Sequence, residues 1–375
     1  MTILEYTIRF ATPAFLGNAE QEAQWRTPPF KALMRQWWRI AKAKDYDYDH
    51  KEMLAKENYL FGTAGEGDQA SESSKTLGRS KVQLRLNRWE LGKQIKVSPG
   101  ESVPHKEAPS GRVGANLYLG YGPVNNKGSR SAIDSHAHNR EEVGELKIAC
   151  PSHFESEIQE AIQFAALFGT MGSRSRNGWG SVVIKEQGAQ RRIEGFDDLI
   201  AGSSTSLPPT RPLEECLNLD WPHALGADKK GPLVWCLLKT IAGKPTCFES
   251  WKDVMQDLAH IKIAIRTDKY FEFENGWAAG HSRPQRRHIL AYPTGKNHNV
   301  KEWGNNSRLA NQLRFKVHHW RDGFAGLIFH FPCALPQHMS APFKGRIPDQ
   351  REVWNKVHQI LDSYGNRLAR QGVKK

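Results

Sequence analysis

Residues 2–10 read TILEYTIRF, and residues 28–42 read PPFKALMRQWWRIAK. In the first stretch apolar and polar side chains alternate, which predicts a half-buried strand. In the second stretch apolar side chains recur at the 3.6-residue spacing of a helix and form one continuous face, made of Phe30, Leu33, Met34, Trp37, Trp38 and Ala41. The chain therefore begins with a strand followed by an amphipathic helix.

The same two periods continue through the first half of the chain. Strands are expected at 80–89, 116–120, 145–149 and 181–185, and a second amphipathic helix at 154–168. The spacing of Ser152 and Glu155 predicts a capping box before that helix, and Gly169 predicts its end. The order of strands and helices is that of a ferredoxin-like, RRM-like α+β domain covering residues 1–190.

The second half of the chain predicts a diverged repeat of the first. Residues 191–230 form a connector with a polar, proline-containing stretch at 199–212. Within 231–375, strands are expected at 233–238, 289–292, 312–318 and 325–331, and helices at 251–261 and 353–368. Residues 62–78 and 98–141 are rich in Gly, Ser and polar residues and are expected to be long loop insertions.

The overall charge points to a polyanionic partner. The 375 residues include 53 Lys and Arg against 40 Asp and Glu, a formal net charge of +13. No stretch approaches the about 18 consecutive apolar residues of a membrane helix, and the first residues do not resemble a secretory signal. The five cysteines form no C-x-x-C pair, so we expect a cytoplasmic protein with reduced thiols, no metal site and no cofactor.

The positive charge is concentrated in particular segments. Lys31, Arg35 and Arg39 follow the polar face of the first helix, and no acidic residue lies one helical turn away to neutralise them. Residues 275–321 hold nine basic residues against the single Glu302, interleaved with histidines and with Trp303 and Trp320. Cations with aromatic side chains suit single-stranded nucleic acid, although each tryptophan taken singly is expected in the core.

The most specific local feature is the run GTMGSRSRNGWG at residues 169–180. Its four glycines permit close backbone approach, and Arg174 and Arg176 add charge where amides are exposed, as a phosphodiester backbone would require. The run lies between a helix and a strand and lacks the G-x-x-x-x-G-K-[ST] pattern of a P-loop. A glycine-rich turn with incidental arginines is the alternative interpretation.

No catalytic constellation is evident. The loop at 11–29 contains no Asp and no His, and Glu20 and Glu22 are its only acids, so a nuclease there would lack a general base or a metal-binding pair. His136 and His138 lie near Asp134 in a polar loop that is expected to be solvated rather than metal-binding. His318 and His319 would point to opposite faces of a strand, which argues against joint ligation.

These segments, taken in order, resemble a known family. The matching pieces are Thr12-Pro13 with Gly17, Arg26-x-Pro28 leading into the basic helix, Leu60-Phe61-Gly62, Gly78-Arg79-Ser80-Lys81-Val82, and Phe168 to Ser181. Together they resemble the first-named RAMP subunit of the Cmr complex, the type III-B CRISPR effector. Arg308 to Phe315 looks like the C-terminal segment of that family.

The resemblance implies a tandem ferredoxin-like RAMP protein without nuclease activity. Such a protein would cap the 3′ end of the guide RNA and help engage target RNA beside other RAMP subunits in antiviral defence. The predicted RNA-binding residues are Lys31, Arg35, Arg39, Arg79, Lys81, Gly169, Gly172, Ser173, Arg174, Arg176, Gly178, Gly180, Arg283, Arg286, Arg287, Arg308 and Arg314.

Two alternatives remain open. One is a CRISPR repeat-processing endoribonuclease of the same superfamily, but those enzymes carry the glycine-rich loop near the C-terminus and usually a catalytic His near the first helix. This chain has the loop at mid-length and no His before His50. The other is a general single-stranded RNA-binding protein, which explains the charge but not the ordered motifs.

Overall fold

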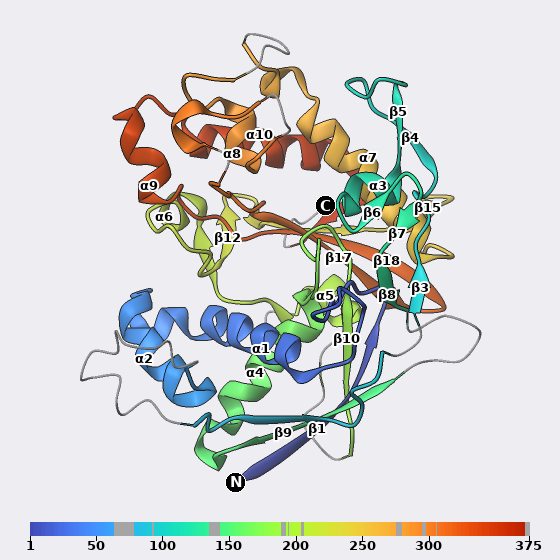
Figure 1. The fold of residues 1–375 in the computed structure, drawn as a ribbon, viewed down its shortest axis with the longest axis vertical. Coiled ribbons are helices and arrows are strands. Elements are labelled where there is room, and N and C mark those ends of the chain that lie inside the picture. The colour runs from blue at the N-terminus through green and yellow to red at the C-terminus, as the bar shows by residue number, and fades with distance from the viewer. Residues whose placement is uncertain are drawn as a thin grey trace. The chain divides into compact units, whose positions relative to one another are not determined.

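The computed structural model describes residues 1–63, 79–91, 94–134, 143–188, 193, 195–203, 206–274, 280–294, 298–304 and 306–371. The chain divides into two compact units, each formed from two segments. The first unit combines Met1–Val97 with Gly128–Pro209, and the second combines Ser98–Lys127 with Thr210–Lys375 (Figure 1). Residues 98–127 therefore group with the second unit, although the chain on both sides of them belongs to the first.

The first unit is built on one four-stranded antiparallel sheet. Its strands are β1 (Thr2–Phe10), β2 (Gln83–Leu86), β9 (Gly144–Cys150) and β10 (Val182–Glu186), arranged in the order β10-β1-β9-β2. Numbered along the chain, this order is 4-1-3-2, with one helix crossing after the first strand and one after the third. The predicted ferredoxin-like fold of this unit is confirmed.

Two helices cover one face of that sheet. Helices α1 (Thr27–Lys42) and α4 (Glu155–Phe168) pack against each other, and β1 turns its alternate residues Leu4, Tyr6, Ile8 and Phe10 into the core beneath them (Figure 1). All six members of the apolar face expected for α1 are buried. A further helix, α2 (His50–Phe61), follows α1 and was not expected from the sequence.

The second unit repeats this arrangement. Strands β14 (Val234–Leu237), β17 (Leu313–Trp320), β18 (Gly323–His330) and β19 (Leu368–Arg370) lie in the order β17-β18-β14-β19, again antiparallel throughout. Helix α7 (Trp251–Arg266) joins the first two strands and α10 (Gln350–Ser363) the last two. Read from β19, the order is once more 4-1-3-2, so the tandem architecture expected from the sequence is confirmed.

Three sequence-based assignments are wrong. Residues 116–120 lie in a helix, α3 (Ala115–Gly120), and the strand expected at 289–292 is replaced by helix α8 (Arg286–Leu290). The closing helix ends at Ser363, so that 368–370 can form β19. A short apolar run fits a buried strand and a buried helix equally well, which explains the first two errors.

The capping box expected before α4 is also absent. Ser152–Phe154 forms a 3₁₀ turn, and the Glu155 carboxylate instead accepts a hydrogen bond from the Thr2 hydroxyl at 3.0 Å. No side chain caps α4, whose first residue follows Phe154 directly. The polar pair thus ties the start of α4 to the start of β1.

Short elements complete both units. In the first unit they are η1 (Ala43–Tyr46), β3 (Gln94–Lys96), β7 (Gly128–Ser129), β8 (Ser131–Ile133), η4 (Ser152–Phe154) and α5 (Phe196–Ile200). In the second they are β4 (Ser102–Pro104), β5 (Arg112–Gly114), β6 (Val124–Asn125), β11 (Thr210–Pro212), α6 (Leu213–Cys216), β12 (Leu225–Asp228), β13 (Gly231–Pro232), β15 (Lys239–Ile241), β16 (Lys244–Thr246), η6 (Lys269–Phe271), η7 (Lys301–Trp303), α9 (Gln337–Ser340), η8 (Ala341–Phe343) and η9 (Gly365–Arg367).

The segment Ser98–Lys127 is fixed to the rest of the second unit by a buried ion pair. The Arg287 guanidinium donates to both oxygens of Glu107, each at 2.6 Å, and only 8% and 12% of the two side chains are exposed. Helix α3 of the same segment packs against α7. Breaking a bidentate pair shielded from water in this way costs more than breaking a surface pair, because it leaves a buried charge without its partner.

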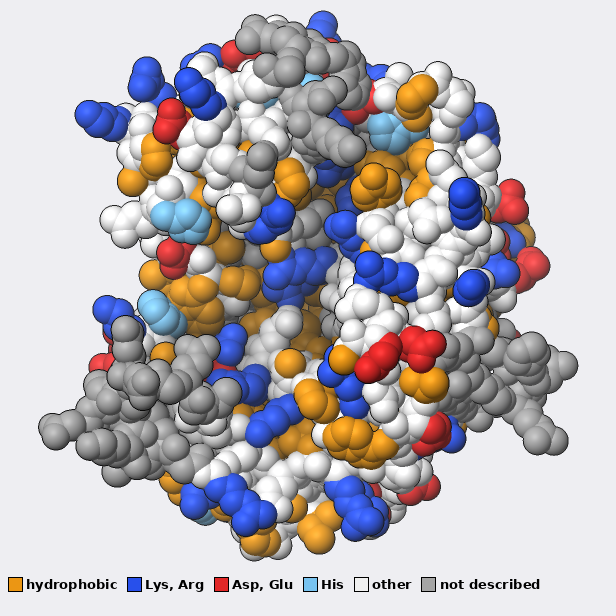
Figure 2. Space-filling view, in the orientation of Figure 1, with side chains coloured by type: hydrophobic (Ala, Val, Ile, Leu, Met, Phe, Trp, Pro, Cys, Tyr) orange, Lys and Arg blue, Asp and Glu red, His pale blue; other side chains and the backbone are white. Residues whose placement is uncertain are grey.

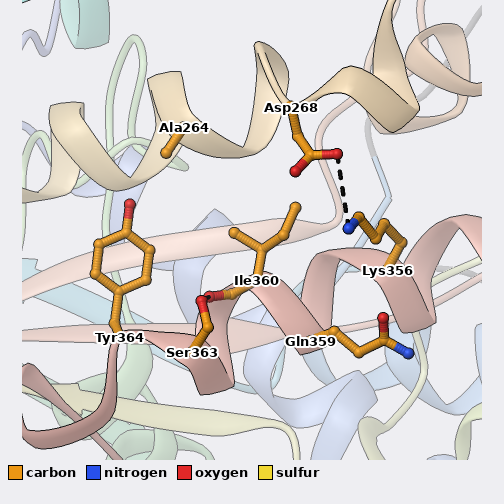
Figure 3. A pocket seen from close by; sticks show the side chains of 7 residues that line it. All are labelled: Ala264, Asp268, Lys356, Gln359, Ile360, Ser363 and Tyr364. Atoms are coloured by element: carbon orange, nitrogen blue, oxygen red, sulfur yellow. Dashed lines mark hydrogen bonds and ion pairs between the residues drawn. The ribbon is translucent and has the colours of Figure 1, made fainter.

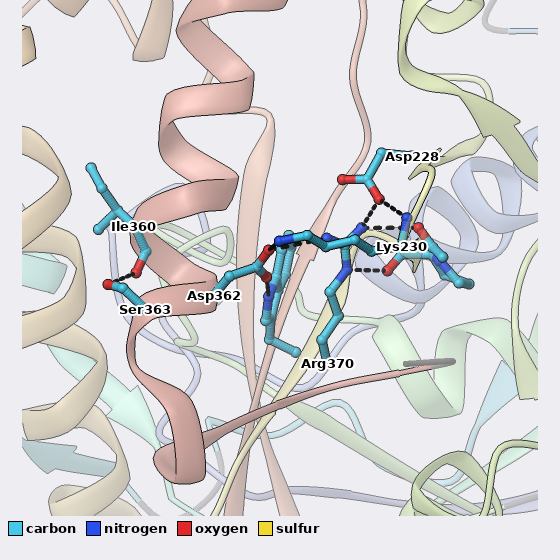
Figure 4. Close-up of polar contacts among 9 residues, drawn as sticks. Asp228, Lys230, Ile360, Asp362, Ser363 and Arg370 are labelled. Carbon is cyan, nitrogen blue, oxygen red and sulfur yellow. Dashed lines mark hydrogen bonds and ion pairs between the residues drawn. The ribbon is translucent and has the colours of Figure 1, made fainter. Parts of the chain in front are cut away.

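A second polar network holds β19 in place (Figure 4). The Arg370 guanidinium lies 2.5 Å from Asp228 and 3.4 Å from Asp362. Asp362 also accepts hydrogen bonds from Lys230 at 2.7 Å and from the indole of Trp235 at 2.9 Å. The edge strand is therefore attached to β12, β14 and α10 by side chains as well as by its backbone hydrogen bonds.

Within the described residues no helix has the length and hydropathy needed to cross a membrane.

Candidate RNA interface

The glycine-rich segment at 169–180 runs from the end of α4 to the start of β10 and is pinned to the loop after β1. The amide of Ser173 donates to the carbonyl of Phe15 and the amide of Gly180 to that of Pro13, both at 3.0 Å. The Thr12 hydroxyl donates to the carbonyl of Gly178 at 2.7 Å. These bonds give the segment one fixed conformation.

Close packing explains why the segment needs glycine. Gly172 (φ +90°) and Gly180 (φ +61°) adopt the left-handed backbone, and a Cβ atom would lie 2.7 Å from the carbonyl of Phe15 and 2.0 Å from that of Met171 respectively. Gly169 has an ordinary φ of −76°, but a Cβ there would lie 2.3 Å from the carbonyl of Ala165. Gly169, Gly178 and Gly180 are buried, so they shape the loop rather than its surface.

The tip of the segment presents cationic and amide groups to solvent. Gly172, Ser173 and Arg174 are exposed, and Arg174 itself has a φ of +60°. Within the described residues, the amides of Gly172, Arg174 and Ser175 donate no hydrogen bond, and the Arg174 guanidinium forms no ion pair. Unused amides beside a free guanidinium form an anion-binding surface. Arg176 is half-buried next to this tip.

The basic face of α1 is largely neutralised from outside the helix. Arg35 and Arg39 each donate to Glu57 on α2 at 2.6 Å, and the Glu57 side chain is only 2% exposed. Burial acts to raise the pKa of Glu57, but hydrogen bonds from Arg39 and Arg35 hold it below its ordinary value. The sequence showed no acidic residue one turn away within α1, and the neutralising carboxylate instead comes from α2, 18 and 22 residues away along the chain.

Three other predicted residues of the first unit, Lys31, Arg79 and Lys81, are at least partly exposed. Lys31 is half-buried one turn before Arg35, and burial together with that arginine lowers its pKa. Arg79 and Lys81 are exposed where the chain passes the end of α2, and the amide of Lys81 donates to the carbonyl of Leu60 at 2.9 Å. None of the three forms an ion pair with a described residue. Figure 2 shows Lys and Arg side chains over the region that α1 occupies in Figure 1.

The predicted residues of the second unit divide into two groups. Arg283, Arg286 and Arg308 are exposed; Arg283 lies 3.0 Å from Glu274, and Arg286 lies 4.2 Å above the ring of Tyr270. Arg287 is held by Glu107, and Arg314 is 6% exposed against the ring of Phe331. The structure thus leaves three of these five side chains accessible to RNA.

Most of the described aromatic and histidine residues of 275–321 belong to the core, while Trp277 lies outside the described residues. Trp303 and Trp320 are each 4% exposed, as expected for the tryptophans taken singly. His281 and His298 lie 3.3 Å apart (Nε2 to Nδ1) and stack on Phe273, and burial lowers the pKa of both. Interleaving of aromatics with cations was therefore a misleading signal for a stacking surface here.

The described residues contain no group of three or more His, Cys, Asp or Glu side chains arranged to hold a metal ion. His136 and His138 lie outside the described residues. His318 is 6% exposed and His319 is half-buried against Phe324. The two follow one another along β17 and so point to opposite faces, as expected.

An open pocket of about 400 Å³ lies between α7 and α10 of the second unit. Figure 3 shows Asp268 on one side and Lys356 on the other, with a nitrogen-to-oxygen distance of 3.7 Å. The remaining lining residues are Ala264, Gln359, Ile360, Ser363 and Tyr364. None of the predicted RNA-binding residues lines it, so the pocket is separate from the basic surfaces.

Sequence reasoning missed Lys56 and Tyr59 on α2. Tyr59 is 45% exposed, and the ammonium groups of Lys56 and Lys81 lie 5.8 Å and 5.7 Å from the centre of its ring. The KENYLFG stretch at 56–62 contains both residues, but only its Leu60-Phe61-Gly62 part contributes to the family resemblance. The signal available in the sequence was an aromatic residue three positions after a lysine on a helix.

Comparison with solved structures finds chains that are similar over most of their length but low in sequence identity. The chain is similar to Cmr1 from Pyrococcus furiosus in its apo form, with 16% identity, 90% of each chain covered and a TM-score of 0.44. It is also similar to a chain of the type III-B Cmr-beta complex bound to cognate target RNA, with 12% identity, 96% of this chain and 100% of that chain covered, and a TM-score of 0.45. No curated protein sequence matches.

The family comparison is confined to the first half of the chain. The family model of the RAMP superfamily matches residues 7–183. This range begins within β1, contains α1 and α4, and ends within β10 just after the glycine-rich segment. Over residues 7–183 the chain is therefore similar to the RAMP superfamily.

Proposed function

We propose that the chain is a non-catalytic, RNA-binding subunit of a type III-B CRISPR effector, the Cmr complex. In this role it caps the 3′ end of the guide RNA and helps capture target RNA beside other RAMP subunits. The RAMP superfamily match over 7–183 supports the proposal, together with the ordered motifs that resemble the first-named Cmr RAMP subunit.

The exposed tip at Gly172–Arg174 is the observation on which the proposal rests. Its free amides and the Arg174 guanidinium are complementary to phosphate oxygens, and the bonds to Pro13 and Phe15 hold them in position before RNA arrives. Contacts to phosphate carry no sequence information. Such a tip suits a subunit in which base pairing to the guide supplies the specificity.

A salt titration with matched variants tests the RNA contact. Affinity of the full chain for single-stranded RNA should fall steeply between about 50 and 200 mM salt and vary little with sequence. Replacing both Arg174 and Arg176 by Ala should weaken binding and flatten the salt dependence, whereas Arg346→Ala, an exposed arginine outside the predicted set, should not. Binding that is unchanged by salt and by the double substitution would refute this site.

Assembly is tested in the native host. A tagged chain should co-purify with other RAMP subunits and with a short guide RNA of uniform length. Recovery of heterogeneous RNA without other RAMP subunits would favour the general single-stranded RNA-binding protein instead.

The absence of nuclease activity is a separate part of the proposal. In the loop between β1 and α1 the only acids, Glu20 and Glu22, are exposed, and the loop has no Asp or His to act on a 2′-hydroxyl or a metal. Incubation with CRISPR repeat RNA, with and without chelator, should leave the RNA intact. Site-specific cleavage that persists in chelator would support the repeat-processing endoribonuclease.

A further inference from the structure

A second surface of the first unit combines exposed rings with lysines. Tyr59 of α2 meets Phe154 edge to face, with ring centres 6.1 Å apart, and the ring centre of the exposed His153 lies 4.0 Å from that of Phe154. Phe154 is itself 5% exposed and forms the floor between the two outer rings. We call Lys56, Tyr59, Lys81 and His153 the Tyr59 patch.

The lysines of the Tyr59 patch are positioned by the fold. Lys56 lies three residues before Tyr59 on α2, with its ammonium 4.2 Å from the ring centre of Phe154. Lys81 is brought beside the same helix because Lys81 and Val82 both donate backbone hydrogen bonds to the carbonyl of Leu60 at 2.9 Å. Neither lysine forms an ion pair with a described residue, so both charges are available to a ligand.

An exposed ring beside two lysines favours a ligand that carries both a flat apolar group and negative charge. A tyrosine held edge-on by a buried phenylalanine cannot turn freely, and its solvent-facing side provides a flat apolar surface. The ammonium groups of Lys81 and Lys56, 5.7 Å and 5.8 Å from the ring centre, lie close enough to contact the phosphates that adjoin a stacked base. A duplex would keep its bases paired and unable to reach the ring.

We infer that the Tyr59 patch is a base-stacking subsite for single-stranded RNA, with one unpaired base on Tyr59 and the adjoining phosphates on Lys56 and Lys81. The inference rests on the proposed RNA-binding function, since it assigns a second contact point on the first unit. Unlike the glycine-rich tip, which reads only backbone, this subsite requires a nucleobase.

Abasic RNA combined with variants of Tyr59 tests the subsite on the full chain. Tyr59→Ala should weaken RNA binding about 5- to 150-fold, the range for losing one stacked base. Tyr59→Phe should bind as the wild type does, and Tyr121→Ala, which removes a 69% exposed tyrosine from the second unit, serves as the matched control. An abasic nucleotide at one position should weaken the wild type by the same factor as Tyr59→Ala and have no further effect on that variant.

The outcomes separate the subsite from the proposed function. If the wild type binds RNA with the expected salt dependence but Tyr59→Ala binds equally well, the stacking subsite is wrong and RNA binding stands. Additive losses from Tyr59→Ala and every abasic position would also overturn the subsite, because they would show that no base meets the ring. If the wild type binds no RNA at any salt concentration, the proposed function and the subsite both fail.

Discussion

Glycines that look alike in the sequence have different roles in the structure. Gly180 and Gly188 both adopt a left-handed backbone, with φ of +61° and +76°. A Cβ on Gly180 would lie 2.0 Å from the carbonyl of Met171, whereas one on Gly188 would meet nothing within 4 Å. The first glycine is needed for both space and conformation, and the second for conformation alone.

This difference predicts unequal costs of adding a methyl group. Gly188→Ala should lower the free energy of unfolding by about 1 kcal/mol, the cost of a left-handed alanine. Gly180→Ala adds the clash with Met171 and should cost about 3 kcal/mol or more. Urea denaturation of both variants measures the difference in their free energies of unfolding. Equal decreases in the two variants would contradict the packing role of Gly180.

Glu57 neutralises the two arginines of α1 and should affect stability in a pH-dependent way. Glu57→Gln removes a buried charge between Arg35 and Arg39 and should cost about 1 to 2 kcal/mol at pH 7. Since the pKa of Glu57 is held below its ordinary 4.5, its contribution is complete above that value and is lost as the pH falls through the lower pKa of the folded state. The difference in unfolding free energy between the two proteins should therefore be full at pH 7 and should shrink as the pH falls below 4.5.

At the scale of elements, amphipathic periodicity correctly predicted the helices and strands that have one apolar and one polar side. The buried face of α1 and the alternation of β1 were found from sequence because one side of each is apolar and the other polar. Helix α2 was missed because only Met53, Glu57, Leu60 and Phe61 of its twelve residues are buried, which leaves no clear stripe. Which basic side chains stay accessible depends on ion-pair partners distant in sequence, such as Glu57 for Arg39. A local sequence pattern cannot show such partners.

The ion pair between Glu107 and Arg287 should control how firmly Ser98–Lys127 is held. Glu107→Ala leaves a guanidinium that is 8% exposed without its carboxylate, which should cost about 3 kcal/mol or more. Hydrogen exchange should accelerate first in α3 and its flanking strands. Lys106→Ala, which removes an exposed pair with Glu272, is the control and should leave exchange nearly unchanged.

At the scale of the whole molecule, buried histidines among the described residues should make the second unit sensitive to mild acid. Burial lowers the pKa of His281, His288, His298, His330 and His358, all in the second unit, with His288 at about 4 and His358 at about 3. These side chains are neutral when folded and take up protons when unfolded, at the ordinary value of 6.5. Stability of the second unit is thus complete above that pH and declines as the pH falls toward 4.

Hydrogen exchange followed from pH 7 to pH 4.5, corrected for the intrinsic rate, checks this expectation. Protection in β17, β18 and α10 should decrease by orders of magnitude, while protection in β1 and α4 should decrease much less. His358→Gln should reduce the acid sensitivity of the second unit, because it removes one of the protons taken up on unfolding. Equal loss of protection in both units would contradict the assignment.

The grouping of Ser98–Lys127 with the second unit also means that this segment is translated long before the residues that it contacts. Glu107 lies 180 residues before its partner Arg287. At translation rates of about 5–20 residues per second, roughly 10 to 40 s separate the two side chains at the ribosome. Within that interval the strands and helices of the first unit are completed at Ile200, whereas α7, against which α3 packs, is completed only at Arg266. The buried side chains of α3, such as Leu119, therefore stay without their α7 partner while at least 50 further residues are made after the first unit's last helix.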